Sequence, residues 1–292
     1  MRLINQKAEL LIQPKGLNGL EKQIEIAART CYKSEDKITE DSAKDMLGKL
    51  VNSKHYAMLE HGTVYLKFDQ NKVPDTMVSK YYLNPYSRAK FRDESGMAYI
   101  TTNYRVLKEH GWTKDLQYWC EPTDNHVKRY TFRLTTSIGI VRELLRHRVF
   151  SFANESTRYV NYNKKGEFYF IKPYWFENDT KGYIEELLHV CENSIQAYNT
   201  LLYTGLPPQA AREVLPLCTK SELIMTGFED DWENFLDVRL RGTTGKPHPD
   251  MFELATLISN QLNIDKMTNG KPMQITMADY LDAYGLEVNY EL

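Results

Sequence analysis

The stretch RHRVFSFANESTRY, residues 146–159, combines three arginines and a histidine with two phenylalanines, two serines and a threonine. A solvated charged segment would not interleave Phe150 and Phe152 with its cations so regularly. A core strand would not carry Arg146 and Arg158, because charged side chains are rarely buried unless they are paired. The mixture therefore predicts a segment that binds a ligand with both charge and flat rings.

Composition limits the kind of protein that carries this stretch. The chain has 292 residues, 42% of them hydrophobic and 26% charged, which is typical of a soluble globular protein with one large or two ordinary domains. Its formal net charge is −2. No broad positive field is available to hold a nucleic-acid backbone or an anionic membrane, so any anion must be bound locally.

Several common signals are missing from the sequence. The start, MRLINQKAELLIQPKG, lacks the apolar core of a secretory signal, and no run of about 18 apolar residues occurs. We expect a cytoplasmic protein. The four cysteines form no CxxC pair, so we expect reduced, independent thiols and no metal site. No GxGxxG or GxxxxGK[ST] sequence is present.

Apolar periodicity predicts alternating helices and strands in a mixed α/β or α+β domain. Residues 135–137 are polar and suit the N-cap of a helix over 138–148, in which Glu143 and His147 share one face, as do Arg142 and Arg146. The polar stretch 69–96 is predicted to be a long insertion or loop. The other predicted helices are 17–32, 40–53, 183–205, 207–216 and 250–263, and the predicted strands are 62–68 and 129–136.

The spacing within this stretch and four further short sequences resemble the pattern of one known family. Arg146-His147-Arg148, followed after seven residues by Ser156 and then by Arg158-Tyr159, resembles the signature of the flavin-dependent thymidylate synthases. Other parts of that family's pattern occur in the same order. They are ARTCY (28–32), HYAMLEH (55–61), AREVLP (211–216) and NFLDVR (234–239), and the likeness covers about residues 20–68 and 138–262.

The resemblance implies an α+β fold, with an antiparallel sheet flanked by helices, that assembles as a homotetramer. It implies a single domain over 1–292, with an insertion at about 69–137 and a tail at about 265–292. The implied reaction is reductive methylation of dUMP to dTMP. Methylenetetrahydrofolate would donate the carbon, NADPH would be the reductant through bound FAD, and no cysteine nucleophile, nucleic acid or membrane would take part.

The resemblance also implies roles for individual residues. Arg239 is the expected catalytic residue, since a fixed cation beside the uracil ring stabilises negative charge at N3 and its neighbouring carbonyls; Arg241 is the substitute if the register differs. A hydroxyl and a guanidinium two residues apart, on Ser156 and Arg158, suit a phosphate. The implied dUMP residues are Glu143, Arg146, Asn154, Ser156, Arg158, Arg212 and Arg239. The implied FAD residues are Cys31, His55, Glu60, Arg146, His147, Arg148 and Asn234.

The chain departs from the family's pattern in four places. Cys31 stands where some members have Ser, Glu143 stands where some have Gln, and Ala153-Asn154-Glu155 replaces a more usual Asn-Glu-x. The stretch TGFEDDWEN (226–234) lacks the Asn-x-Arg that often precedes the position of Asn234. Some flavin contact must then come from elsewhere, and TTNYR (101–105) is a candidate.

Other interpretations of the same residues remain open. Arg-His-Arg by itself is most often a solvated helix end, and His61 could be a satisfied, half-buried histidine. Arginines interleaved with aromatic residues, as in KRYTFR (128–133), also suit a single-strand nucleic-acid groove, although the slightly acidic chain argues against one. The sequence LPLCTK around Cys218 faintly resembles the cysteine-nucleophile thymidylate synthases, with Lys220 near enough to lower a thiol pKa.

Overall fold

The computed structural model describes residues 1–90, 95–162, 167–179 and 181–262. The described residues form three sheets. The central sheet has the order β2-β6-β9-β7, with all neighbours antiparallel, and its strands are β2 (Lys7–Leu11), β6 (Arg129–Ser137), β9 (Lys220–Phe228) and β7 (Ser151–Asn154). The predicted mixture of helices with antiparallel sheet is confirmed.

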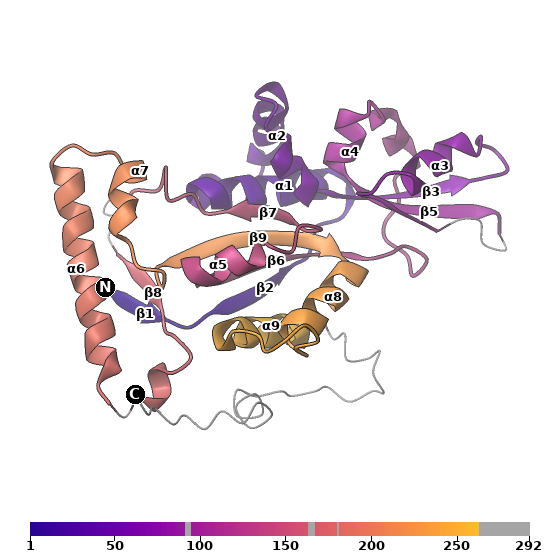
Figure 1. Ribbon diagram of the computed structural model, residues 1–292. Helices are drawn as coiled ribbons and strands as arrows, with labels where there is room; N and C mark the ends of the chain where they lie inside the picture. Colours follow the sequence, from indigo (N-terminus) through magenta and orange to yellow (C-terminus); the bar gives the residue numbers. More distant parts are fainter. Residues whose placement is uncertain (91–94, 163–166, 180, 263–292) are drawn as a thin grey trace.

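Two smaller sheets flank the central one (Figure 1). One is antiparallel, in the order β3-β5-β4, with β3 (Thr63–Asp69), β5 (Met97–Asn103) and β4 (Arg88–Lys90). The other is a parallel pair of β1 (Arg2–Ile4) and β8 (Tyr169–Ile171) beside the long helix α6.

Helices cover both faces of the central sheet. In Figure 1, α1 and α2 lie over one face and α8 and α9 over the other. The helices are α1 (Gly16–Tyr32), α2 (Ser42–Asn52), α3 (Thr76–Tyr82), α4 (Tyr104–Glu109), α5 (Ile138–Leu144), α6 (Tyr183–Tyr203), α7 (Pro208–Ala211), α8 (Glu229–Arg239) and α9 (Pro249–Leu262). Short 3₁₀ turns are η1 (Glu35–Lys37), η2 (Tyr56–His61), η3 (Thr113–Tyr118), η4 (Phe176–Asn178) and η5 (Arg212–Val214).

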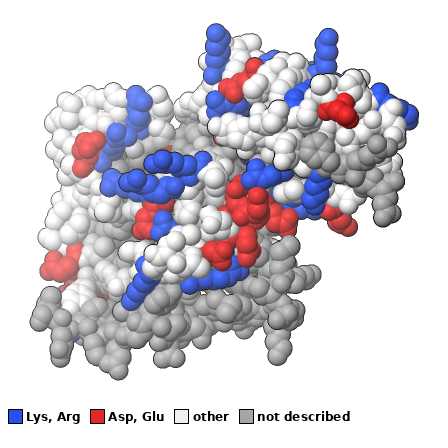
Figure 2. All heavy atoms as spheres, turned by 45° about the vertical axis from the view of Figure 1, so that its right-hand side comes forward, with Lys and Arg blue, Asp and Glu red and all other residues white. Residues whose placement is uncertain are grey.

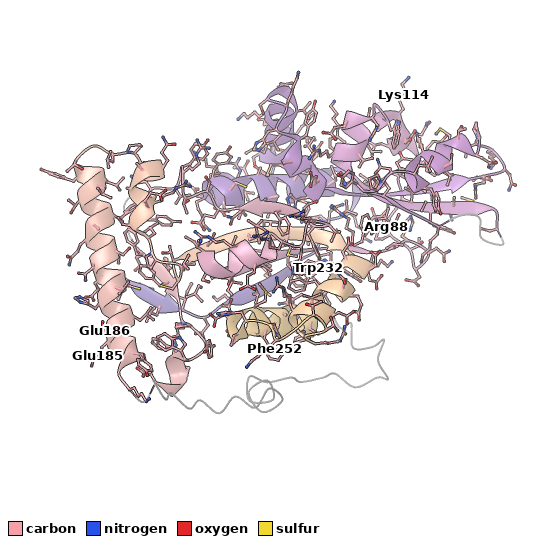
Figure 3. All side chains as sticks on the ribbon, viewed as in Figure 1. Arg88, Lys114, Glu185, Glu186, Trp232 and Phe252 are labelled. Carbon is pink, nitrogen blue, oxygen red and sulfur yellow. The ribbon has the colours of Figure 1, made fainter. Side chains whose placement is uncertain are left out.

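The middle of strand β9 is apolar, as expected for a strand that is buried on both faces. Its Leu223 and Met225 pack into a core with Trp232 of α8 and Phe252 of α9 (Figure 3). Ile224, which points to the opposite face, packs into a second core with residues of α1, α2, β3 and β5. Strand β9 therefore contributes side chains to both hydrophobic cores, one on each face of the central sheet.

Most predicted elements are confirmed, with two corrections. Ser137 is the N-cap of α5, since its Oγ accepts a hydrogen bond from the Ile140 backbone N–H at 3.2 Å. The helix predicted over 138–148 ends at Leu144, because tight backbone bonds, such as that from the His147 N–H to the Leu144 carbonyl at 3.0 Å, turn the chain there. The helix predicted over 207–216 is limited to α7 and the 3₁₀ turn η5.

The stretch 69–96 is more than a loop, since it contains α3 and β4. The predicted insertion 69–137 ends in β6, which lies inside the central sheet. The predicted tail at 265–292 lies outside the described residues. In the part of the chain that is described, no helix combines the length and apolar character needed to cross a membrane.

Candidate functional site

The arginine-rich stretch leaves α5, turns at residues 145–149 and enters β7 through a buried phenylalanine. Phe150 is only 6% exposed, and its ring lies 4.6 Å, between centroids, from that of Trp232. A Cβ at Gly227 would lie 2.4 Å from the Phe150 ring, so only glycine permits this close approach. The aromatic side chain of Phe150 therefore anchors the stretch to the core.

Three of the predicted ligand residues meet between α5 and α8. The Arg239 Nε–H donates to His147 Nε2 at 2.9 Å, and its Nη1 lies 3.0 Å from a carboxylate oxygen of Glu143. Because a guanidinium can only donate, His147 Nε2 must be unprotonated. Burial and then the charge of Arg239 lower the His147 pKa to about 4, so the ring is neutral at neutral pH. Arg241 instead pairs with Glu233 and Asp237.

A second group of predicted residues lines an open groove beside the end of α1. Cys31, His55, Asn154 and Ser156 all lie in it. The Ser156 backbone N–H donates to the Cys31 carbonyl at 2.9 Å, which fixes the loop after β7 against α1. Burial, and then nearby Glu35, raise the Cys31 pKa to about 11, so this sulfur is a neutral thiol at neutral pH. The remaining lining residues are Tyr32, Ser53, Lys54 and Tyr159.

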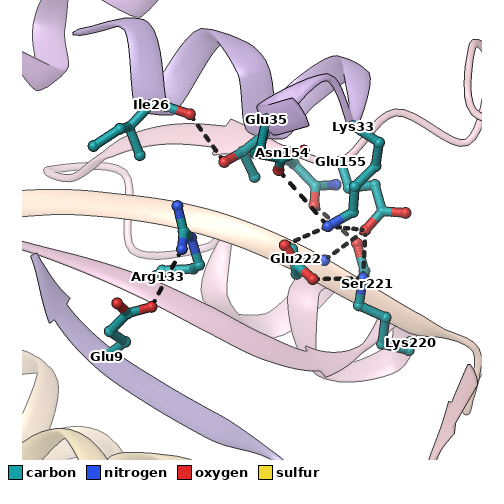
Figure 4. Close-up of polar contacts among 11 residues, drawn as sticks. Glu9, Ile26, Lys33, Glu35, Arg133, Asn154, Glu155, Lys220, Ser221 and Glu222 are labelled. Atoms are coloured by element: carbon teal, nitrogen blue, oxygen red, sulfur yellow. Dashed lines mark hydrogen bonds and ion pairs between the residues drawn. The ribbon is translucent and has the colours of Figure 1, made fainter. Parts of the chain in front are cut away.

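A buried network of four charges holds this loop to the sheet (Figure 4). Glu155, 2% exposed, accepts from the Lys220 ammonium at 3.0 Å, and Lys220 also lies 2.7 Å from Glu222. Lys33, at the end of α1, pairs with Glu222 and lies 3.6 Å from Glu155. Burial raises the Glu222 pKa, but the two ammonium groups outweigh it and bring the value down to about 2. The loop that carries Ser156 is thus attached to both β9 and α1.

Two more predicted residues lie on the same loop or contact it. Arg212 Nη1 donates to the Thr157 hydroxyl at 3.0 Å, which brings η5 against the loop. Arg158 is exposed, with its guanidinium 5.4 Å from the centroid of the Tyr159 ring. Ser156, Arg158 and Arg212 therefore lie on or beside one short segment that displays hydroxyl and guanidinium donors.

A third group of predicted residues lies around a cavity of about 410 Å³, at the junction of the β3-β5-β4 sheet with the central sheet. Glu60 and Arg148 line it, and so does Arg105 of the candidate stretch 101–105, which pairs with Glu60. Arg88 also lines it, and Figure 3 shows Arg88 at this junction. Arg129, for which the sequence indicated no role, also lines the cavity. The alternating pattern RYTFR (129–133) could have indicated a shared face for Arg129, Thr131 and Arg133, because side chains two residues apart in a strand point to the same side.

Arg146 and Asn234 are exposed and belong to none of these three groups. His61 is fully buried, and its Nδ1 lies 2.8 Å from the Thr226 hydroxyl. Burial and then the charge of Arg129 lower the His61 pKa to about 3. His61 is therefore fully buried, whereas the structural interpretation expected a half-buried side chain.

Charges of both signs are interspersed on the face drawn in Figure 2. Among the described residues on this face, lysines and arginines lie beside aspartates and glutamates and form no extended basic stripe. A single-strand groove uses such a stripe to follow the nucleic-acid backbone. This face therefore offers no support for the nucleic-acid alternative.

Comparison with known proteins finds similarity to one family over the second half of the chain. The family described as "Thymidylate synthase complementing protein" matches residues 125–263. The probable flavin-dependent thymidylate synthase of Paramecium bursaria Chlorella virus 1 is 28% identical over 136 residues, 41% of this chain and 61% of the viral protein. The flavin-dependent thymidylate synthase of Synechocystis sp. is 32% identical over 129 residues, 40% of this chain and 60% of the relative.

A third relative and one solved structure extend the comparison. The flavin-dependent thymidylate synthase of Corynebacterium glutamicum is 34% identical over 164 residues, 51% of this chain and 59% of the relative. A UMP/dUMP methylase from Streptomyces cacaoi, bound with 5-Br dUMP, aligns over 98% of this chain and 99% of its own, with 18% identity and a TM-score of 0.45. That score is too low for an argument from its fold or ligand.

The chain spans about 60% of the length of the curated relatives that it matches. The family match covers the second of the two regions in which the sequence resembles the flavin-dependent thymidylate synthases. Residues 125–263 match the family model of the thymidylate synthase complementing protein, and these relatives support the predicted resemblance to the flavin-dependent thymidylate synthases.

Proposed function

We propose that the protein is a flavin-dependent thymidylate synthase. It would convert dUMP to dTMP with methylenetetrahydrofolate as the carbon donor and NADPH as the reductant. The observation that carries this proposal is the convergence of separate segments on the groove beside α1. Cys31, His55, Asn154 and Ser156 are contributed by three parts of the chain, and the resemblance assigns all four to ligands.

The residues around the cavity suit a flavin dinucleotide. Four arginines line it, and Arg129 Nε is buried without a hydrogen-bond partner in the described chain. Tyr86 and Phe228 add aromatic surface. Bound FAD would carry electrons from the reductant to the transferred carbon. Its proposed contacts are Cys31, His55, Glu60, Arg146, His147, Arg148 and Asn234.

The loop 155–160 is the proposed binding site for the dUMP phosphate. Ser156, Arg158 and Arg212 offer one hydroxyl and two guanidinium groups on or beside this loop, and such charge-assisted donors bind phosphate strongly. The Glu155 network holds the loop in place before the nucleotide arrives, which lowers the ordering cost of binding. Glu143, Arg146, Asn154 and Arg239 are the proposed contacts to the rest of the nucleotide.

Arg239 is the proposed catalytic residue. Uracil C5 attacks the carbon donor more readily when negative charge at N3 and the adjacent carbonyls is stabilised, and a cation in a fixed position does this. Glu143 and His147 hold the Arg239 guanidinium from two sides, so little reorganisation is needed during the reaction. Arg241 is engaged by Glu233 and Asp237, which favours Arg239 for this role.

No cysteine nucleophile is needed in this scheme. The Cys218 sulfur lies 3.8 Å from that of Cys191, and both residues contribute to one hydrophobic cluster. Lys220, the cation that could have activated Cys218, is bound by Glu155 and Glu222. These ion pairs leave Lys220 unavailable to activate Cys218 as a nucleophile.

We further propose that one domain of this chain acts within a homotetramer in the cytoplasm. The predicted ligand residues lie in three separate places of one chain, and Arg146 and Asn234 are exposed outside all three. This division supports active sites that are completed by residues of neighbouring subunits. Light scattering in the presence of FAD and dUMP should give four times the mass of one chain. A monomer mass would contradict the assembly.

Absorption spectroscopy and product analysis test the activity. The purified protein, supplemented with FAD and passed through a gel-filtration column, should retain about one oxidised flavin per chain. It should then form dTMP from dUMP, methylenetetrahydrofolate and NADPH. A protein without a flavin band that forms no dTMP would refute the proposed function.

A further inference from the structure

Two of the four cysteines are close neighbours, although the sequence indicated independent thiols. Cys191 lies in the middle of α6, and Cys218 lies two residues before β9 begins at Lys220. Their sulfurs are 3.8 Å apart, although the residues are 27 positions apart in the chain. Both are free thiols, and neither has a role in the proposed reaction. The pair is therefore available for chemistry of its own.

Hydrogen bonds hold the backbone on both sides of this sulfur pair. The Cys218 carbonyl accepts a hydrogen bond from the Ile171 N–H of β8 at 2.8 Å. On the other side, Ser194 follows Cys191 by three residues in α6, and its hydroxyl donates to the Val214 carbonyl at 2.6 Å. The helix and the segment that leads into β9 are therefore attached to their surroundings with the two sulfurs facing each other.

The distance between the sulfurs is close to what a disulfide requires. The sulfurs of a disulfide lie about 2.05 Å apart, so these two would have to approach each other by roughly 1.8 Å. A partial rotation of one cysteine side chain about its Cα–Cβ bond moves the sulfur by a comparable distance. The bond can therefore form through movement of side chains, without separation of α6 from the segment before β9.

The two thiols differ in exposure and in acidity. Cys191 is fully buried, whereas Cys218 is partly exposed and can be reached from solvent. When Cys191 donates its S–H to the Cys218 sulfur, this hydrogen bond lowers the Cys218 pKa, although burial opposes the change. The same hydrogen bond, and then burial, raise the Cys191 pKa. Because the thiolate is the reactive form of cysteine, Cys218 is the thiol that reacts first.

We propose that Cys191 and Cys218 are a site of reversible oxidative modification, at which a small-molecule disulfide such as oxidised glutathione converts the two thiols to a disulfide. The Cys218 thiolate attacks one sulfur of the oxidant, breaks its S–S bond and releases one glutathione thiolate. Cys191 then loses its proton, attacks the Cys218 sulfur and displaces the second glutathione as a thiolate. The two protons from the cysteines pass to the two glutathione thiolates, so one disulfide is reduced while the other is formed.

The new bond closes a loop that contains α7 and η5. Arg212 lies in this loop, and its guanidinium donates to the Thr157 hydroxyl. A disulfide restricts the unfolded chain, so the oxidised protein should be more stable than the reduced protein. Capture of Cys218 by Cys191 also stops the further, irreversible oxidation that an isolated reactive thiol undergoes. This inference does not depend on the proposed function.

Peptide mapping tests the bond directly in the wild-type protein. The full chain is incubated with oxidised glutathione, its remaining thiols are alkylated, and it is digested with trypsin without a reductant. Trypsin cuts at Arg212, between the two cysteines, which leave in peptides 182–212 and 213–220. These peptides should be joined, and only Cys31 and Cys120 should be alkylated. Separate peptides, whether alkylated or carrying glutathione, would overturn the proposal.

Three variants test the roles of the individual thiols. Cys191→Ser lacks the second thiol, so glutathione should accumulate on Cys218, whereas Cys218→Ser should leave the buried Cys191 without glutathione. Cys120→Ser is the matched control, because Cys120 is also partly exposed but its sulfur contacts His126 and no other thiol. It should form the disulfide as the wild type does. Glutathione on Cys191 in Cys218→Ser would overturn the proposed order of attack.

Urea unfolding measures the effect on stability. Oxidation of the wild type should lower the equilibrium constant for unfolding by roughly a hundredfold, and dithiothreitol should reverse the change. Oxidation of Cys191→Ser should produce no such gain. A wild type that becomes less stable on oxidation, or that dithiothreitol does not restore, would overturn the assignment of a reversible site in the folded protein.

Discussion

The carboxylate of Glu155 lies 3.0 Å from the ammonium group of Lys220, although 65 residues separate them in the chain. The side chains are 1% and 11% exposed, so the pair is buried. Glu155 immediately precedes Ser156, and Lys220 begins β9. The central strand of the fold is therefore tied directly to the loop proposed to bind phosphate.

Breaking this pair should destabilise the protein strongly. We expect Glu155→Gln and Lys220→Met each to lower the free energy of unfolding by about 3–5 kcal/mol, because each leaves an uncompensated charge in the network. The double variant should lose less than the sum of the two. Urea unfolding at one protein concentration measures all three, and Lys172→Met, which breaks the exposed pair with Glu177, is the control, with a loss below about 1 kcal/mol. Additive losses in the double variant would argue against a direct interaction.

Arg239→Ala should lower the rate of dTMP formation by about 10² to 10³, because one preorganised electrostatic contact to the uracil ring is removed. Flavin content, measured by absorption, should be unchanged. Arg241→Ala, on the same helix but paired with Glu233 and Asp237, should keep nearly full activity. A slow Arg241→Ala beside a normal Arg239→Ala would move the catalytic role to Arg241.

Ser156→Ala and Arg158→Ala should weaken dUMP binding while FAD stays bound. The loss of a charged hydrogen bond to the phosphate costs on the order of 2–3 kcal/mol, or roughly a hundredfold in affinity. Titration calorimetry with dUMP measures the change. Unchanged dUMP affinity in both variants would show that the phosphate binds elsewhere.

Cys218→Ser should remain active, because Cys218 faces Cys191 and its potential activating cation, Lys220, is bound by carboxylates. The measurement is dTMP formation, and Cys191→Ser, which removes the other sulfur of the same contact, is the control for packing. A folded, flavin-bound but inactive Cys218→Ser would favour the cysteine-nucleophile mechanism.

His61 should make the protein sensitive to mild acid. Burial, and then the charge of Arg129, lower its pKa in the folded state from 6.5 to about 3. Between these values the unfolded chain binds a proton that the folded chain does not. The free energy of unfolding therefore falls as the pH falls, by about 1.4 kcal/mol per pH unit from this group.

His61→Gln can still bond to Thr226 but cannot titrate, so its unfolding free energy should fall less steeply than that of the wild type between pH 6.5 and 4.5. Urea unfolding at several pH values measures the two slopes. His189→Gln, at an exposed site on α6, should retain the wild-type slope. Parallel profiles for His61→Gln and the wild type would refute this origin of the acid sensitivity.

The local pattern of apolar residues was enough to predict the helices and strands that have one buried face. The apolar spacing of residues 17–32 and the alternation of 129–136 predict α1 and β6, because side-chain direction in a helix or strand follows from the backbone repeat alone. Ser137 was predictable as a cap for the same local reason. The shared face of Glu143 and His147 also followed from helical spacing, and both side chains contact Arg239.

The partners of these residues were decided by tertiary structure. No local pattern indicates that Arg239 crosses from α8 to α5, that Lys220 meets Glu155, or that Arg129 donates to the Glu60 carbonyl and the Ser151 hydroxyl. Each contact depends on which strands pair and in what register, such as Arg129 opposite Phe228. Phe150 is the clearest example, because its neighbouring residues in the sequence do not indicate whether its side chain faces a ligand or the core.

By itself the sequence determined the mixed helix-and-sheet class, most helix positions and the family resemblance, since these depend on backbone periodicity and on residue spacing along the chain. The division of the ligand residues into a groove, an α5–α8 cluster and an arginine-lined cavity was decided only by the tertiary structure. The physical reason is that burial and charge pairing depend on the packing of segments far apart in the chain.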